Sequence, residues 1–373
     1  MHAGTRNVLR LGTKELKSLR TDPVLLLLIL YVFSYAVYAV ATGVKFEVEN
    51  ASIAIVDEDH SSLSRSLAQA ILPPYFKPPE QISANEVADA MDRGRFVFVL
   101  GIPPHFEADV LAARKPEIQI NVDATAMALA GNGAIDLQNI LANEVTTYLQ
   151  RSQAGIIQPI DVIVHSRFNP NLRSVWFTSV MQVINNITIL SIVLTGAALI
   201  RERERGTIEH LLVMPVTPFE IMLAKIWANG LVIIVAAMLS LWLLVQTLLQ
   251  VPVAGSIPLF LAGAVLYQFS VTALGLLIAS FTNSMPQFGL LVMPVLVVIN
   301  LLSGSTTPME SMPEWLQYVM QISSSTQFVA FAQAILYRGA GLDLVWPYLI
   351  ALGALGAAYF AVSLMRFRRA LAS

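Results

Sequence analysis

The chain has 373 residues, of which 55% are hydrophobic and only 13% are charged, whereas soluble domains carry roughly 25% charged residues. The formal net charge of -2 leaves no basic excess, so composition gives no support to a nucleic-acid-binding function. There is no cysteine, and the fold therefore contains no disulfide.

The charged residues are strongly segregated along the chain. Between their clusters lie four uncharged stretches, at 23–44, 174–200, 226–309 and 344–365. A membrane-spanning helix needs about 20 mostly apolar residues. The third stretch is long enough for three spans, which polar residues divide into 226–249, 257–281 and 288–302. The pattern therefore predicts a protein that crosses the membrane six times.

The segment 1–22 alternates basic and apolar residues, which predicts an amphipathic helix on the cytoplasmic membrane surface, facing lipid headgroups. It serves either as a topology anchor alone or also in docking a partner. By the positive-inside rule its five basic residues place the N-terminus in the cytoplasm. A cleaved signal peptide ending near Ala39-Val40-Ala41 is the alternative to a first span at 23–44, but its apolar stretch is too long.

The segment 45–173 lies outside the cytoplasm in this topology and has the length of one compact domain. Its β-branched runs predict strands at 52–56, 96–100, 118–122 and 162–164, and helices are expected at 63–72, 87–93 and 124–153. The run Asp57 to Ser61 resembles the start of a calcium loop. Ser62 and Ala68 stand where that loop requires glycine and glutamate, so we interpret the run as a capped turn between strand and helix.

The predicted fold class is therefore an α-helical polytopic membrane protein with six transmembrane helices and an inserted mixed α/β extracytoplasmic domain. A seventh span over 315–337 is disfavoured by its polar centre, Ser323 to Gln327, and because it would move the C-terminal arginines outside. The expected organisation is a cytoplasmic interfacial helix at 1–22, span 1 at 23–44, the extracytoplasmic domain at 45–173, span 2 at 174–200, a cytoplasmic loop at 201–225, spans 3–5 at 226–303, an extracytoplasmic re-entrant or interfacial helical hairpin at 304–343, span 6 at 344–365 and a cytoplasmic tail at 366–373.

Strongly polar side chains are rare within the predicted spans and usually face other helices or water rather than lipid. Two alternatives remain open for them: they line a transport pathway, or they form hydrogen bonds between helices. The candidates are Gln182, Asn185, Asn186, Asn229 and Asn300.

Catalytic motifs are missing from the sequence. There is no G-x-x-x-x-G-K-[ST] motif to hold nucleotide phosphates, no H-x-x-x-H pair or cysteine partner for a metal, and no G-x-S-x-G motif. We expect no catalytic residue, bound cofactor or metal on this chain, and no ATP hydrolysis by the chain alone.

The loop after the second predicted span carries the most informative pattern. A charged helix end is followed by a glycine stop, a short amphipathic helix from Thr207 to Val213 and a turn bounded by Pro215 and Pro218. The run from Glu204 to Lys225, E-R-G-T-x-E-x-L-L-x-x-P-x-x-P-x-E-x-x-x-x-K, resembles the coupling-loop motif of ABC-2 type transporter permeases. The domain order resembles the subgroup with a large extracytoplasmic domain between the first two spans.

This resemblance implies a permease subunit that pairs with a second permease, as a homodimer or heterodimer, and that binds a separate ATPase subunit carrying ATP and Mg. It implies location in a bacterial inner membrane with both termini cytoplasmic, and contact of the outer domain with a periplasmic adaptor protein. It further implies export, and the uncharged spans with their Phe, Trp and Met residues suggest a drug-like, amphipathic or lipid-like substrate, although the same residues also occur on helix faces that only touch lipid. The residues expected to couple to the ATPase are Glu204, Gly206, Thr207, Glu209, Leu211, Leu212, Pro215 and Glu220.

Two other classes of function remain in competition. The first is a membrane-anchored receptor or scaffold that presents the outer domain without transport, for which six spans are excessive. The second is a channel or ATP-independent carrier, which we disfavour because the sequence predicts no Asp, Glu, Lys or Arg inside a span.

Overall fold

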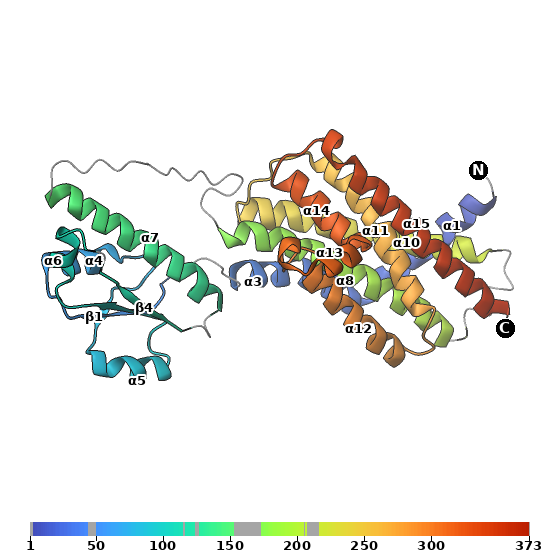
Figure 1. Ribbon diagram of the computed structural model, residues 1–373. Coiled ribbons are helices and arrows are strands. Elements are labelled where there is room, and N and C mark those ends of the chain that lie inside the picture. Colours follow the sequence, from blue (N-terminus) through green and yellow to red (C-terminus); the bar gives the residue numbers. More distant parts are fainter. Residues whose placement is uncertain are drawn as a thin grey trace. The chain divides into compact units, whose positions relative to one another are not determined.

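The computed structural model describes residues 3–43, 50–114, 116–123, 127–152, 173–204, 206 and 216–372. The chain forms two compact units, one made of Met1–Gly43 with Val175–Ser373 and the other of Val44–Ser174. We term them the helical unit and the α/β unit (Figure 1). The predicted strand at 162–164 lies outside the described residues.

The helical unit contains six helices that are long and apolar enough to cross a membrane, in agreement with the predicted number. The first span is broken at Ser34 into two helices, and the third changes from an α-helix to a π-helix at Ser240. The spans are formed by α2 (Pro23–Phe33) with α3 (Tyr35–Gly43), α8 (Ser174–Glu204), α10 (Pro218–Leu239) with η3 (Ser240–Leu248), α11 (Ile257–Ala279), α12 (Met285–Leu302) and α15 (Leu342–Ala372).

Three shorter elements lie between the fifth and sixth spans. They are η4 (Met309–Ser311), α13 (Glu314–Gln321) and α14 (Ser324–Leu336). Because α14 has only 13 residues and a span needs about 20, this stretch does not form a seventh span. Helix α14 packs instead against α11 and α15, and its Phe328 stacks on Tyr267 of α11 with ring centroids 4.2 Å apart.

Helices α8 and α11 form the centre of the helical unit. In their most apolar stretches 78% and 61% of the residues are buried, against 17% in α12. The two central helices approach closely at Gly275, where a Cβ atom would lie 2.9 Å from the main chain of Ile192. A glycine at such a contact lets helix backbones pack directly against each other.

The two chain termini lie at the same end of the helical unit (Figure 1). Helix α1 (Ala3–Thr21) lies at this end, as do the C-terminus of α8 and the N-terminus of α10. The opposite end carries Gly43 and Val175, the residues that flank the α/β unit in the sequence. The basic residues of α1 and the arginines near the end of α15 therefore share one end of the unit, as the predicted topology requires.

The α/β unit is built on a four-stranded sheet in the order β2-β1-β3-β4. The strands are β1 (Ile53–Asp57), β2 (Glu80–Gln81), β3 (Phe98–Ile102) and β4 (Gln119–Val122). Strand β1 runs parallel to β2 and β3, and β4 pairs antiparallel with β3. Strands β1, β3 and β4 lie at three of the predicted positions, whereas the two-residue strand β2 was not predicted.

Helices cover both faces of the sheet, which explains why the central strands are apolar on both sides. Ile53 and Ile55 of β1 face a core shared with α4 (Ser62–Ala70), α6 (Phe106–Leu111) and α7 (Met127–Ser152). Ala54 and Val56 face the other side, toward α5 (Val87–Asp92) after the short helix η1 (Ala84–Glu86). Each unit thus has its own apolar core.

The turn after β1 is a helix cap, as the sequence predicted. The carboxylate of Asp57 accepts hydrogen bonds from the amides of Asp59 and His60, at 3.1 and 2.9 Å. The Ser61 hydroxyl then caps α4 by accepting from the amide of Ser64 at 3.0 Å. These carboxylate and hydroxyl oxygens are engaged by the chain itself.

The close approach of α8 and α11 leads to a prediction about stability. We expect Gly275→Ala to lower the thermal stability of the purified protein, because the added methyl group meets the Ile192 backbone at 2.9 Å. Overpacking of this kind costs about 1–3 kcal/mol. Gly353→Ala is the matched control, since a Cβ there meets nothing within 4 Å. The proposed contact is wrong if both variants unfold at the same temperature in a detergent thermal-shift measurement.

Candidate functional site

The segment between α8 and α10, residues 205–217, carries most of the motif identified in the sequence. It is termed here the α8–α10 segment. Arg205, Thr207, Glu209, Leu211, Leu212 and Pro215 lie outside the described residues. The structure shows how the two ends of the segment are held.

Gly206 ends helix α8. Its backbone has a φ of +66° and its amide donates to the carbonyl of Arg203 at 3.1 Å. This left-handed conformation after the last helical turn favours glycine, because a Cβ would be strained there. The predicted glycine stop is therefore confirmed, and it fixes the direction in which the chain leaves α8.

Helix α10 begins with a capping box. The Thr217 hydroxyl accepts from the amide of Glu220 at 3.3 Å, and the Glu220 carboxylate accepts from the amide of Thr217 at 2.7 Å. Pro218 occupies the first helical turn, where its missing amide hydrogen costs nothing. Glu220, expected as a contact for an ATPase, thus also fixes the other end of the α8–α10 segment.

The last four residues of α8 each contact a different part of the helical unit. Arg201 lies 3.7 Å from the carboxylate of Asp22, and Glu202 lies 2.8 Å from Lys225. Arg203 donates to the carbonyl of Thr282 at 2.6 Å, between α11 and α12. Glu204 accepts from the amide of Met285 at 2.8 Å and so caps α12, whose own N-cap serine makes no side-chain bond. These contacts fasten the end of α8 to α2, α10, α11 and α12.

Lys225 is the buried centre of this region. Its side chain is 2% exposed, and its ammonium lies 2.9 Å from the carboxylate of Glu15 in α1 and 2.8 Å from that of Glu202 in α8. A buried charge requires such partners, because removing one member of a buried pair costs about 3–5 kcal/mol. The three side chains, termed the Lys225 triad, join three separate helices at one point.

Helix α1 packs along α10 beside the triad. The indole nitrogen of Trp227 donates to the carbonyl of Val8 at 3.2 Å. Gly12 of α1 lies so close to the same indole that a Cβ would be 2.1 Å from the ring. The contact with α10 therefore requires a residue without a side chain at position 12.

Lys225 lies within a helix and not in the loop to which the sequence assigned it. The sequence placed it at the end of the loop 201–225, but the capping box at Thr217 starts α10 before it, within the span Pro218–Leu248. Glu202 likewise lies inside α8, which continues to Glu204 instead of ending at Ile200. The T-P-F-E sequence is a helix-start signal that indicates the earlier start.

Two of the five polar residues predicted within the spans, Asn186 and Asn229, form hydrogen bonds between helices. Asn186 donates to the carbonyl of Val32 at 2.7 Å and accepts from Gln182 at 2.9 Å. Asn229 donates to Thr195 at 3.2 Å, which joins α10 to α8. Asn185 is 7% exposed, and Asn300 lies apart on α12, where its carbonyl accepts from two hydroxyls that follow the helix. Bonds between helices thus occur at Asn186 and Asn229, and a pathway lined by these five residues stays a prediction.

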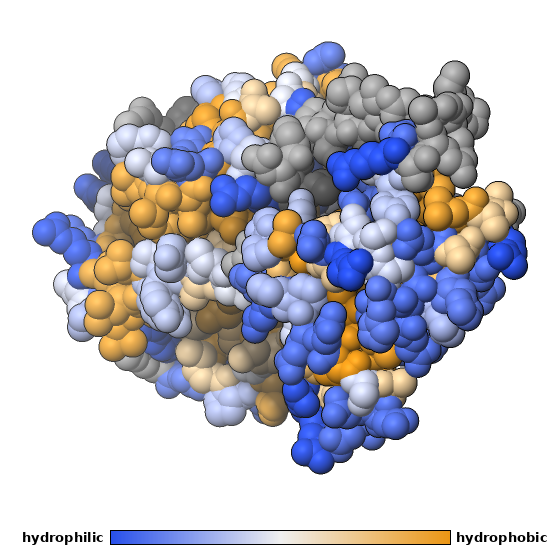
Figure 2. All heavy atoms as spheres, turned by 90° about the vertical axis from the view of Figure 1, so that its left-hand side faces the viewer, coloured by the Kyte–Doolittle hydropathy of each residue, from blue (hydrophilic) through white to orange (hydrophobic). Residues whose placement is uncertain are grey.

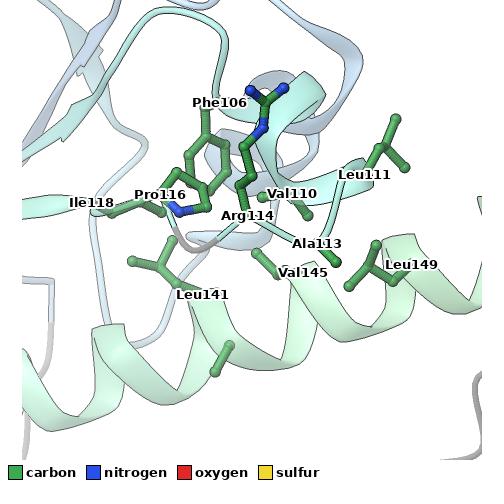
Figure 3. Close-up of a pocket in the computed structure, with 11 residues that line it drawn as sticks. Phe106, Val110, Leu111, Ala113, Arg114, Pro116, Ile118, Leu141, Val145 and Leu149 are labelled. Atoms are coloured by element: carbon green, nitrogen blue, oxygen red, sulfur yellow. The ribbon is translucent and has the colours of Figure 1, made fainter.

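The α/β unit has an apolar groove with a volume of about 550 Å³. Phe106, Val110 and Leu111 of α6 lie on one side and Leu141, Val145 and Leu149 of α7 on the other (Figure 3). The guanidinium of Arg114 at the rim pairs with Asp109 at 3.0 Å. Apolar patches are also visible between hydrophilic side chains on the face of the molecule shown in Figure 2.

The N-terminal end of α6 is held by a polar cluster. The Glu107 carboxylate accepts hydrogen bonds from the hydroxyls of Tyr148 in α7 and Ser62 in α4. These hydrogen bonds, with that from Tyr148 the strongest influence, lower the pKa of Glu107. Among the described residues no group of three His, Cys, Asp or Glu side chains could hold a metal ion.

The helical unit is that of a multi-pass membrane protein, and its charged end contains the predicted motif. The family profile of ABC-2 family transporter proteins matches residues 23–365, which include the first five spans and most of the sixth. The chain therefore belongs to the ABC-2 family of transporter permeases.

Related proteins agree with this assignment over nearly their full lengths. The chain is 50% identical over 366 residues to the inner membrane transport permease YhhJ of Escherichia coli K12, and the match covers 98% of each chain. It is 30% identical to the probable multidrug ABC transporter permease YbhR of the same organism, over 95% of this chain and 96% of the relative. A third relative, the probable multidrug ABC transporter permease YbhS of Escherichia coli K12, is 26% identical, over 90% of this chain and 89% of the relative.

The contact between Glu204 and α12 leads to a second prediction. Glu204→Ala removes the acceptor of the Met285 amide, so we expect faster hydrogen exchange in the first turn of α12, by the equivalent of about 1 kcal/mol. Glu58→Ala, at an exposed carboxylate of the α/β unit, is the control. Unchanged exchange in α12 would show that Glu204 does not cap this helix.

Proposed function

We propose that the chain is the transmembrane subunit of an ATP-binding cassette exporter, driven by ATP and Mg bound to a separate ATPase subunit. The observation that carries the proposal is the α8–α10 segment: its sequence resembles the coupling loop of the family, and both of its ends are rigidly fixed. Gly206 and the Thr217 capping box set its two ends. Ends fixed in this way pass a push on the segment to helices α8 and α10.

The residues proposed to contact the ATPase are Glu204, Gly206, Thr207, Glu209, Leu211, Leu212, Pro215 and Glu220. Glu204 and Glu220 have structural contacts of their own, so their effect on the ATPase combines direct contact with placement of the segment. Glu209, the remaining acidic residue of the proposed contact set, lies outside the described residues. A charge reversal at Glu209 tests the proposed contact without removing the structural contacts of Glu204 and Glu220.

A second permease subunit is the other protein partner that we propose. Helix α12 leaves most of its apolar surface uncovered, with Leu290 78% and Met293 64% exposed. Such a surface must face either lipid or another apolar protein surface. Whether the second subunit is identical or different is left open by this argument.

We place the protein in the bacterial inner membrane, with both termini cytoplasmic and the α/β unit periplasmic. The placement is supported by the clustering of basic residues at the end that carries both termini, and by the printed name of the 50% identical relative. The α/β unit is then available to a periplasmic adaptor protein, and its exposed apolar residues, such as Leu72 and Tyr75, are candidate contacts.

The proposed cargo is a drug-like, amphipathic or lipid-like molecule. Two of the relatives are named as probable multidrug transporter permeases, and the spans of this chain are apolar. Membrane-soluble molecules can reach such helices from the bilayer. The competing function, a receptor or scaffold without transport, requires no ATPase.

Coupling to an ATPase is tested by co-purification. We expect the double variant Glu209→Arg, Gly206→Pro to lose both the ATPase and transport, because proline cannot adopt the φ of +66° found at Gly206. Glu117→Arg, an exposed charge reversal in the α/β unit, is the control and should retain both. Retention of ATPase and transport by the double variant would overturn the coupling assignment.

Export is tested by dye accumulation in cells with and without the gene. We expect cells lacking it to accumulate more ethidium, Hoechst 33342 or another amphipathic dye of a panel, and expression of the wild-type chain with its ATPase to reverse the effect. Equal accumulation across the whole panel would contradict drug efflux. If the chain also bound no ATPase, the scaffold function would be favoured instead.

A further inference from the structure

The Lys225 triad connects both flanks of the α8–α10 segment to helix α1. Glu202 lies just before the segment and Lys225 lies a short way after it, while Glu15 comes from a helix 210 residues away in sequence. The lysine ammonium bridges both carboxylates, at 2.9 and 2.8 Å. Any movement of one flank therefore acts on the other flank and on α1.

Helix α1 is in turn joined firmly to the first span. It ends at Thr21, and the next residue, Asp22, caps α2 by accepting from the amides of Val24 and Leu25, both at 3.1 Å. The second carboxylate oxygen of Asp22 faces Arg201 of α8 at 3.7 Å. The joint between α1 and α2 is thus tied to the same end of α8 as the triad.

We propose that Lys225 is a positioning residue that makes α1 and both flanks of the α8–α10 segment move as one body, so that a stroke of the ATPase reaches the first span. This inference rests on the proposed function. Through α1 and Asp22 the stroke is carried into α2 and α3, the span that leads into the α/β unit. Without the triad, α1 keeps only its packing against α10 and the contact between Asp22 and Arg201, which hold it less tightly to the two flanks.

A charged bridge is suited to this role for a physical reason. Apolar residues of similar volume would stabilise the helix contact as well as a buried ion pair does, and often better. An ion pair with two acceptors instead fixes direction and distance, because the ammonium has to stay within hydrogen-bonding reach of both carboxylates. The triad therefore holds α1, α8 and α10 in a fixed relative geometry, which apolar contacts between these helices would not do as strictly.

The test uses the full-length chain reconstituted with its partner ATPase in lipid vesicles. Because the chain has no cysteine, Thr13→Cys on the exposed side of α1 provides a single site for a maleimide probe. We expect the labelling rate at this site to change when ATP and Mg are added. Transport of Hoechst 33342 and ATP hydrolysis are measured on the same vesicles.

The decisive variant is the triple change Lys225→Met, Glu15→Gln, Glu202→Gln, which removes all three charges without leaving a buried charge unpaired. We expect it to fold, bind the ATPase and hydrolyse ATP, but to lose both the nucleotide-dependent labelling of α1 and dye transport. The single variant Lys225→Arg keeps a cation between the two carboxylates. It should retain both the nucleotide-dependent labelling of α1 and dye transport. Lys77→Met, at an exposed lysine of the α/β unit, controls for the substitution itself.

The outcomes separate this proposal from the proposed function. A triple variant that keeps nucleotide-dependent labelling and transport overturns the positioning role, and so does one that simply fails to bind the ATPase. Lys225→Arg behaving like the triple variant would also overturn it. A wild-type chain that never binds the ATPase instead overturns the proposed function, and this inference with it.

Discussion

Burial of the Lys225 ammonium is the constraint on which the arrangement of the charged end depends. An ammonium that is 2% exposed within a helix bundle must be neutralised, and the two carboxylates that do so come from α1 and α8. Helix α1 therefore packs along α10, and the last turn of α8 lies against the second turn of α10. Arg201, Arg203 and Glu204 then meet partners on the neighbouring helices.

The middle of the helical unit is held together, in the part of the chain that the structure describes, by hydrogen bonds between polar side chains and not by ion pairs. Burying a polar side chain in an apolar environment costs free energy unless the side chain forms a hydrogen bond. Gln268 illustrates this, since it accepts from Ser191 at 2.8 Å and donates to Thr272 at 3.1 Å. Together with Asn229 and Thr195, these side chains join α8, α10 and α11. The central helices are thus held by hydrogen bonds and close glycine contacts, and the charged end by ion pairs.

The α/β unit is independent of both arrangements because it has its own core on each face of its sheet. Its groove between α6 and α7 is about 550 Å³ in volume, and the Glu107 cluster fixes one end of α6. The unit is thus a compact domain of its own, with exposed apolar residues on its surface.

The sequence predicted the larger features for a simple reason. Long, uncharged and mostly apolar stretches are typical of membrane spans, and runs of β-branched residues between helices indicate a mixed sheet. Strand β2 was missed because Glu80 and Gln81 are two exposed polar residues that pair only through their backbones. Lys225 is the last charged residue before the uncharged stretch 226–309, so the sequence pattern assigned it to the preceding loop.

The Lys225 triad could not be predicted from spacing, since Glu15 and Lys225 are brought together only by the tertiary fold. The same holds for Glu204, whose contact with Met285 spans 81 residues of sequence. The motif of the α8–α10 segment, in contrast, is a local pattern and was identified directly. Long-range ion pairs and caps are therefore the part of the site that required the structure.

The most direct test of the account is photo-crosslinking in cells that express the chain with its ATPase. A benzophenone amino acid is placed at position 209, in the α8–α10 segment, and in a second experiment at position 75, on the exposed surface of the α/β unit. The account predicts a crosslink from position 209 to the ATPase and none from position 75. A crosslink to the ATPase from position 75 and none from position 209 would contradict it.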